Sequence, residues 1–147
     1  MISDDQKKPI AELMAQEHVA VINTMGDEWA TSTLEAFAET PELELVIILG
    51  ESSERFQNIQ KRPQVSFLIT HRYGEVPKFQ VKRLSGRGIA REVKKDTPEW
   101  NELKPLFLKK NAFEEPFFGN PALKMLRIEP KRLKYQDALN PPITLEF

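Results

Sequence analysis

Most of the chain alternates between apolar and polar residues over short runs, which predicts a mainly β protein. In residues 64–70 the apolar side chains fall on every second position, as in a strand with one buried face. Residues 43–49 are apolar almost throughout and predict a strand that is buried on both faces. Residues 18–24 and 29–38 are strand-like and flank a turn that contains Gly and Asp, so they predict a hairpin.

Three further segments carry helical signals, at residues 4–16, 54–61 and 98–110. Thr97 followed by Pro98 is a strong helix start, because threonine caps a helix and proline favours its first position. Ser52 or Ser53 can cap the short helix over residues 54–61. Pro63 ends that helix, because the residue before a proline avoids the helical conformation.

The second half of the chain predicts one long bent strand followed by two short ones. Residues 79–93 change the parity of their apolar positions, and two glycines favour a bulge between Arg83 and Gly88. Short strands are expected at residues 123–128 and 133–135. The strands are joined by hairpin turns and do not alternate with helices as in βαβ units. This pattern predicts a closed antiparallel barrel, because closure leaves no exposed sheet edge.

Composition limits the chemistry and the setting. The 147 residues suffice for a domain with a real core, and we expect residues 1–147 to form a single domain. The absence of cysteine excludes disulfides, thiolate catalysis and iron–sulfur clusters, and two histidines alone argue against a histidine metal site. No apolar run reaches the ~18 residues of a membrane span, and the first residues lack a signal-peptide pattern. We therefore expect a cytoplasmic protein without a membrane partner.

Charge is distributed unevenly along the chain. Residues 27–54 hold eight acids and no Lys or Arg, whereas residues 78–95 hold seven bases and one acid. We expect two surfaces that complement each other across the fold or across a dimer contact. Nucleic-acid binding is the alternative, but the basic stretch lacks the interleaved exposed aromatics of a single-strand binder. We therefore expect no nucleic-acid partner.

The segment from Gly50 to Pro63 is the best candidate for a binding site. It combines a glycine turn, the hydroxyls of Ser52 and Ser53, the guanidinium of Arg55 and a helix start. Backbone N–H groups at a helix N-terminus and a nearby guanidinium bind anions, so a cofactor phosphate could lie there. The alternative is that serine only caps the helix and that Arg55 is solvated.

The order of these features resembles the pyridoxamine 5′-phosphate oxidase-like superfamily of FMN-binding split barrels. The residues that match its characteristic stretch are Ser53, Arg55, Asn58, Ile59, Pro63 and Val65. With the strands and helices around them, the resemblance extends over residues 11–137. It implies a mainly β fold, a six-stranded antiparallel split β-barrel of Greek-key type with about three short helices.

The resemblance also implies a homodimer that binds FMN at the subunit interface and acts as a small-molecule oxidoreductase. The cofactor would carry the redox chemistry, which fits the lack of an evident catalytic acid, base or nucleophile. The threonine-rich strand would face the flavin ring, the serine–arginine turn would hold the phosphate, and the second subunit would complete the site. The cofactor-binding residues implied are Thr31, Ser32, Thr33, Leu49, Gly50, Ser52, Ser53, Arg55, Asn58, Lys82 and Arg83.

Two departures from the family pattern leave other functions open. The neighbourhood of Arg55 is rich in acids, at Glu42, Glu44, Glu51 and Glu54, and uncompensated negative charge disfavours a phosphate. The chain also lacks the C-terminal Trp/Arg substrate signature of true pyridoxamine phosphate oxidases, so we do not expect their reaction. The alternatives are a barrel that binds a deazaflavin or haem, and a non-enzymatic dimer, stress-associated or ligand-binding, without a tightly bound cofactor.

Overall fold

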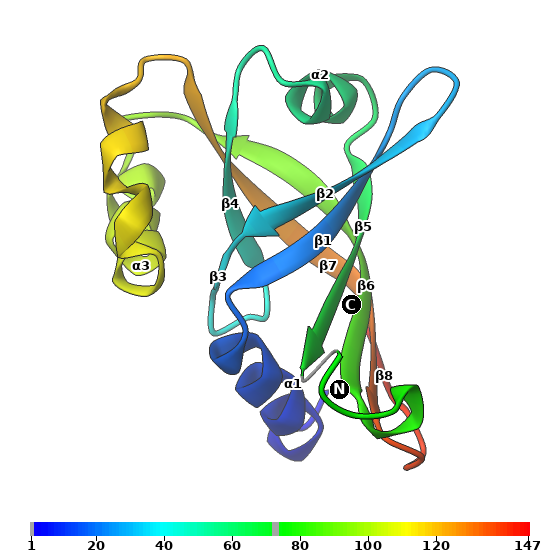
Figure 1. Ribbon diagram of the computed structural model, residues 1–147. Coiled ribbons are helices and arrows are strands. Elements are labelled where there is room, and N and C mark those ends of the chain that lie inside the picture. Colours follow the sequence, from blue (N-terminus) through cyan, green and yellow to red (C-terminus); the bar gives the residue numbers. More distant parts are fainter. Residues whose placement is uncertain (1, 72–73) are drawn as a thin grey trace.

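The computed structural model describes residues 2–71 and 74–147, and Figure 1 shows how its elements are arranged. In chain order the elements are α1 (Asp4–Gln16), β1 (Val19–Met25), β2 (Ala30–Ala36), β3 (Ala38–Glu39), β4 (Leu45–Gly50), α2 (Glu54–Lys61), β5 (Gln64–His71), η1 (Lys78–Gln80), β6 (Lys82–Val93), α3 (Pro98–Lys110), η2 (Ala112–Gly119), β7 (Leu123–Asp137) and β8 (Ile143–Glu146). No helix in this described part has the length and apolar character needed to cross a bilayer.

The strands form one antiparallel sheet, and its two edge strands, β2 and β3, are consecutive in the chain. Over the described residues the strand order is β2-β1-β5-β6-β7-β4-β3, and β8 pairs with β7. Only Phe37 separates β2 from β3, so the sheet curls until its edges approach each other, as Figure 1 shows. The two edges do not pair within the described strands. The split-barrel class is therefore confirmed, but the sheet has eight strands instead of six and is not closed.

The inside of the curled sheet holds the main hydrophobic core. Inward side chains such as Ile22 and Phe67 are buried there, and α1 adds Leu13 and Met14 at one end of the barrel. Strand β4 is buried on both faces, as its apolar sequence predicted. Its Val46 joins a second core that packs under α3. The three α-helices have the bounds that the sequence patterns predicted.

Two strand predictions for the second half of the chain were wrong, whereas the predicted bulge is confirmed. Residues 123–128 and 133–135 belong to one strand, β7, which runs through Pro130. The predicted bulge lies at Arg87 and Gly88, where the register with β7 shifts, so a proline opposite it does not break the ladder. Residues 79 and 80, predicted to begin the long strand, lie in the short helix η1 instead. Residues 143–146 add strand β8, which the sequence patterns did not predict.

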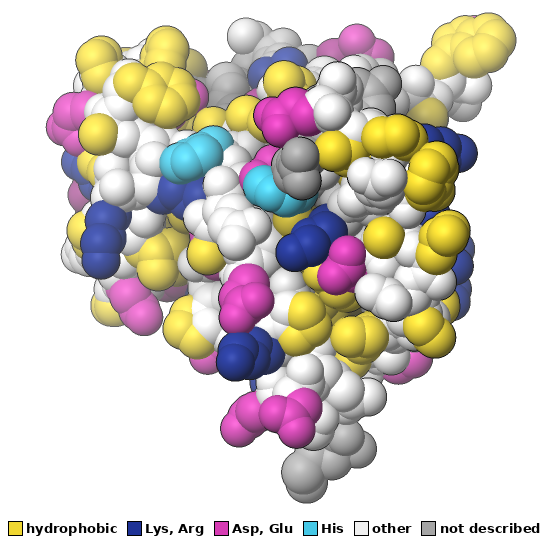
Figure 2. All heavy atoms as spheres, turned by 60° about the horizontal axis from the view of Figure 1, so that its bottom comes forward, with side chains coloured by type: hydrophobic (Ala, Val, Ile, Leu, Met, Phe, Trp, Pro, Cys, Tyr) yellow, Lys and Arg dark blue, Asp and Glu magenta, His cyan; other side chains and the backbone are white. Residues whose placement is uncertain are grey.

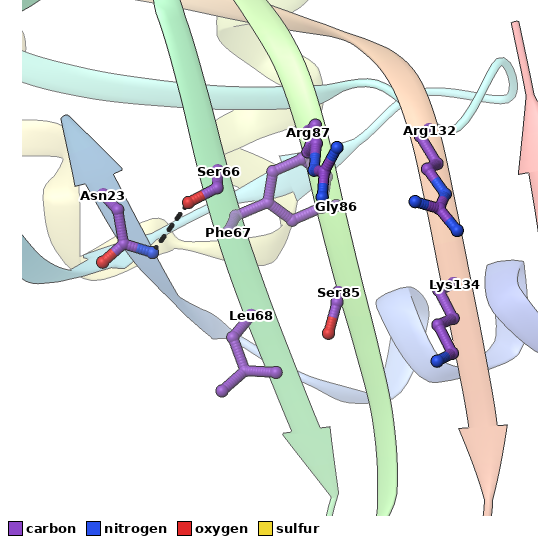
Figure 3. Close-up of a pocket in the computed structure, with 9 residues that line it drawn as sticks. All are labelled: Asn23, Ser66, Phe67, Leu68, Ser85, Gly86, Arg87, Arg132 and Lys134. Carbon is purple, nitrogen blue, oxygen red and sulfur yellow. Dashed lines mark hydrogen bonds between the residues drawn. The ribbon is translucent and has the colours of Figure 1, made fainter. Parts of the chain in front are cut away.

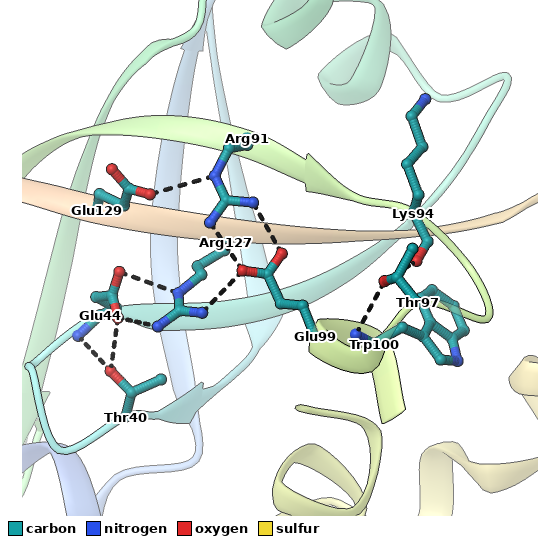
Figure 4. A network of polar contacts seen from close by, with 9 residues as sticks. All are labelled: Thr40, Glu44, Arg91, Lys94, Thr97, Glu99, Trp100, Arg127 and Glu129. Atoms are coloured by element: carbon teal, nitrogen blue, oxygen red, sulfur yellow. Dashed lines mark hydrogen bonds and ion pairs between the residues drawn. The ribbon is translucent and has the colours of Figure 1, made fainter. Parts of the chain in front are cut away.

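A charged network fastens α3 to the sheet, as shown in Figure 4. Glu99 accepts two hydrogen bonds from Arg91, at 2.8 and 2.9 Å, and one from Arg127 at 3.0 Å. Arg127 also donates to Glu44 at 3.0 Å. Hydrogen bonds from Arg91 hold the pKa of Glu99 below its ordinary value. These charges satisfy one another, so the network stabilises the docking of α3 and offers no open charge to a ligand.

Candidate functional site

Strand β2 divides the predicted ring-binding residues between two faces of the sheet. Thr31 points towards α2, where its hydroxyl donates to Glu54 Oε1 at 2.9 Å. Ser32 points to the opposite face and donates to Asn23 Oδ1 at 2.5 Å. Thr33 shares the parity of Thr31, because successive side chains alternate along a strand. The three residues predicted to face one flavin ring therefore do not share one face in this chain.

Three other predicted residues come together beside α2. Leu49 and Gly50 end β4, Arg55 lies in the first turn of α2, and all three line a cavity of about 210 Å³, called here the α2 cavity. Glu114 and Phe117 of η2 also line it. Ligand pockets usually measure about 300–1,000 Å³, so one chain alone does not enclose a cofactor here.

Arg55 is the guanidinium of the α2 cavity, and a carboxylate already pairs with it. Its Nε lies 2.8 Å from Glu35 Oε1, and the two side chains are 31% and 13% exposed. Burial raises the pKa of Glu35 above its ordinary value, although Arg55 opposes this shift. Burial also raises the pKa of Glu114. Arg55 thus shares the cavity lining with one carboxyl group, Glu114, and pairs with a second, Glu35 of β2.

The serine turn before α2 caps the helix. Ser53 Oγ accepts a hydrogen bond from the Phe56 N–H at 3.2 Å and donates to the Gly50 carbonyl at 2.8 Å. A hydroxyl has one hydrogen to donate, so Ser53 has none left for a phosphate oxygen in this arrangement. Ser52 is exposed on the same turn. The capping alternative for Ser53 is therefore what the structure shows.

The remaining predicted residues lie away from the α2 cavity. Asn58 is buried, and its Nδ2 donates to Thr24 Oγ1 at 3.0 Å, which ties α2 to β1. Lys82 and Arg83 begin β6, at the end of the molecule opposite α2 in Figure 1. One chain does not bring them to the α2 cavity, so their role in a second subunit stays a prediction.

These contacts decide whether the α2 cavity fits the phosphate of FMN. A phosphate monoester carries about −1.5 to −2 charges at pH 7 and needs free donors. Here Arg55 faces Glu35, the hydrogen of Ser53 is engaged, and Glu54 adds a carboxylate at the helix start. The nearby carboxylates therefore oppose a phosphate dianion, although no hydrogen bond to a described residue engages the Nη groups of Arg55.

The two histidines lie at the end of the molecule that α1 covers, and Figure 2 shows both of them at its surface. His71 Nδ1 is 3.0 Å from Glu17 Oε2, a contact that joins β5 to the end of α1. Among residues 2–71 and 74–147, no three histidine or acidic side chains are grouped to hold a metal ion. The part of the chain that is described thus assembles no metal centre.

The sequence analysis did not predict a further site, a cavity on the outer face of the sheet that is shown in Figure 3. Its cavity of about 440 Å³ is lined by Asn23, Ser66, Phe67, Leu68, Ser85, Gly86, Arg87, Arg132 and Lys134. A second cavity of about 380 Å³ adjoins it and shares Asn23, Ser66 and Arg87. We call the two together the outer groove. The alternation of Ser85 and Arg87 in the sequence was the available signal, but which strand lies beside them was not predictable.

The sequence matches no protein-family model and no curated protein. Solved structures do match its fold. A haem-binding protein from Mycobacterium smegmatis aligns with a TM-score of 0.86 at 13% identity, over 99% of this chain and 60% of that one. This chain therefore spans about three fifths of that protein.

Two shorter proteins align over nearly their whole length. A candidate pyridoxamine 5′-phosphate oxidase from Listeria innocua has a TM-score of 0.71 and 15% identity, over 89% of this chain and 98% of that one. General stress protein 26 from Bacillus anthracis has a TM-score of 0.68 and 19% identity, over 96% and 98%. The chain thus has the split-barrel fold of the pyridoxamine 5′-phosphate oxidase-like proteins, as its sequence predicted. Structures of this fold include haem-binding proteins, so the fold alone does not select FMN.

Proposed function

We propose that this chain is a split-barrel binding protein that does not hold FMN tightly. The observation that carries the proposal is the contact of 2.8 Å between Arg55 and Glu35. A phosphate entering the α2 cavity would meet a guanidinium whose charge a mostly buried carboxylate already offsets. A carboxylate beside the bound phosphate disfavours FMN binding, because the two negative groups repel each other.

An FMN-dependent oxidoreductase of unknown substrate is the second candidate. It is supported by the convergence of Leu49, Gly50 and Arg55 on one cavity, which the family resemblance implied. FMN would supply hydride or electron transfer in such a protein. This candidate requires the Nη groups of Arg55 to bind the phosphate while Glu35 lies beside Nε. A deazaflavin or haem in place of FMN is a variant of the same candidate.

The visible spectrum of the purified protein, followed by an FMN titration, separates these candidates. We expect a colourless protein without flavin or haem absorbance. We also expect the FMN affinity of Arg55→Ala to lie within about twofold of wild type, because Glu35 already offsets the charge of the guanidinium. A protein that is purified with stoichiometric flavin, or a tenfold loss of affinity in Arg55→Ala, would establish the oxidoreductase candidate instead.

We also propose that the protein is a homodimer. Large apolar side chains are exposed on β2, next to β2 and on η2, including Trp29 (80%), Leu34 (65%) and Phe113 (69%). Exposed apolar side chains of this size favour a protein contact when they form a patch. Light scattering during gel filtration should give twice the chain mass of 17.0 kDa. A monomer at micromolar concentration would contradict this proposal.

A further inference from the structure

The outer groove has two chemically different ends. Its cavity of about 380 Å³ has a mainly apolar lining that includes Met25 and Ile89, with the cations Arg87 and Lys131 also lining it. Its cavity of about 440 Å³ is lined by the cations Arg87, Arg132 and Lys134. Among the described residues, no Asp or Glu lines either cavity. A ligand lying along the groove would meet apolar surface at one end and positive charge at the other.

The cations of the groove are largely without partners. Among the described residues, no hydrogen bond or ion pair engages the charged groups of Arg87 and Lys134. Arg132 Nε lies 3.2 Å from Glu146, whose carboxylate is 69% exposed. Water screens an ion pair that is this exposed, so Glu146 compensates little of the charge.

The strand register concentrates this charge. Arg87 on β6 lies directly opposite Arg132 on β7, and Ser85 lies opposite Lys134. Like charges on directly opposed residues destabilise a sheet, and positions two apart on one strand are only about 7 Å apart. An anion bound between these side chains would relieve their mutual repulsion.

Hydrogen-bond donors continue the pattern, as Figure 3 shows. Asn23 Nδ2 donates to Ser66 Oγ at 3.1 Å, and Ser32 donates to Asn23 Oδ1, which fixes the orientation of the amide. The hydroxyl hydrogens of Ser66 and Ser85 have no acceptor among the described residues. A ligand that only accepts hydrogen bonds, such as a carboxylate or phosphate, would satisfy them.

We infer that the outer groove binds a small amphipathic anion, a molecule with an apolar body and a carboxylate or phosphate group. Each of the two cavities lies within the range of about 300–1,000 Å³ that is usual for small-molecule pockets. The groove shares no lining residue with the α2 cavity, so this inference stands or fails independently of the proposed function.

Displacement of the fluorescent probe anilinonaphthalene sulfonate from the full chain tests the inference. We expect decyl phosphate and decanoate to displace the probe, whereas neutral decanol and inorganic phosphate do not at equal concentration. The order of the first two distinguishes a phosphate headgroup from a carboxylate. Displacement by decanol as strong as that by decyl phosphate would overturn the inference, because charge would then play no part.

Matched variants locate the site. Arg87→Gln and Lys134→Gln should each weaken decyl phosphate binding about tenfold. Lys95→Gln removes the same charge from the basic segment outside the groove and should change it less than twofold. Thermal melts establish that each variant is folded. Equal losses in all three variants would overturn the inference. So would light scattering that shows the first two variants becoming monomers, because a second chain would then cover the groove.

Discussion

The α2 cavity and the outer groove both present arginine to solvent, but they differ in what surrounds it. In the α2 cavity Arg55 faces Glu35, and Glu114 lines the same wall. In the outer groove Arg87 lies beside Arg132 on the next strand, and no acid lines the cavity. The sequence motif pointed to the first arginine, whereas the unpaired charge lies at the second. An anion site is indicated by a cation without a partner, and a motif does not reveal whether the partner is present.

The glycines at the two sites should respond differently to alanine, which gives the largest effect that we expect. A Cβ on Gly86 would lie 2.0 Å from Cζ of the core residue Phe67, whereas a Cβ on Gly50 would meet no atom within 4 Å. We expect Gly86→Ala to destabilise the fold by about 3 kcal/mol, or roughly 6–12 °C in a thermal melt. Gly50→Ala should change stability by less than about 0.5 kcal/mol. Equal melting temperatures would mean that the Phe67 ring moves aside freely.

Removing two acids near Arg55 should make the α2 cavity resemble the outer groove. We expect the double variant Glu35→Gln, Glu54→Gln to bind FMN roughly 10- to 100-fold more tightly than wild type, because Arg55 is released and a carboxylate is lost at the helix start. Fluorescence titration of FMN measures this change. Glu42→Gln is the matched control, because it removes one charge from an exposed turn of the same acidic segment. If the double variant binds FMN no better than this control, Glu35 is not what closes the cavity.

The fold was largely predictable because its signals are local. The three α-helices follow from capping residues and apolar spacing, and β4 from a continuous apolar run. The strand β7 was missed because Pro130 normally interrupts a ladder. Here the bulge at Arg87 and Gly88 on the neighbouring strand accommodates it. The rule that proline interrupts a strand failed here, because the bulge that accommodates Pro130 lies some forty positions earlier in the sequence.

The candidate site was less predictable, because it depends on strand phase and register. Ser32 and Thr31 are adjacent in sequence, yet alternation sends them to different faces. Glu35 meets Arg55 only because β2 places its odd positions towards α2. Arg87 and Arg132 are neighbours only through the β6–β7 register. None of these contacts can be predicted from the spacing of residues in the sequence alone.

The network at Glu99 extends the comparison to a cluster in which the charges satisfy one another. We expect Glu99→Gln to destabilise the protein by about 1–2 kcal/mol at pH 7, because Arg91 and Arg127 lose a shared acceptor. Urea unfolding measures this loss. Glu102→Gln, on an exposed position of α3, is the control and should be nearly neutral. Anion binding in the outer groove should not change in either variant, so an altered displacement of the probe would show that the two regions are coupled.

The smallest expected effect concerns how the free energy of unfolding depends on pH. Glu99 and Glu35 should contribute to it with opposite signs. Arg91 lowers the pKa of Glu99, so the stability that Glu99 contributes is present above its ordinary value of 4.5 and is lost as pH falls through the lowered pKa. Burial raises the pKa of Glu35, so its protonated form favours the fold at low pH. That contribution is lost as pH rises from 4.5 through the raised pKa.

Urea unfolding of wild type, Glu99→Gln and Glu35→Gln across the acidic range tests these signs. The stability advantage of wild type over Glu99→Gln should shrink as pH falls, because the wild-type carboxylate becomes protonated. The advantage over Glu35→Gln should shrink as pH rises, because the buried carboxylate must ionise beside Arg55. If both advantages change in the same direction, the guanidinium dominates at Glu35 as it does at Glu99. The α2 cavity would then hold a fully satisfied ion pair, and the case against a phosphate there would become stronger.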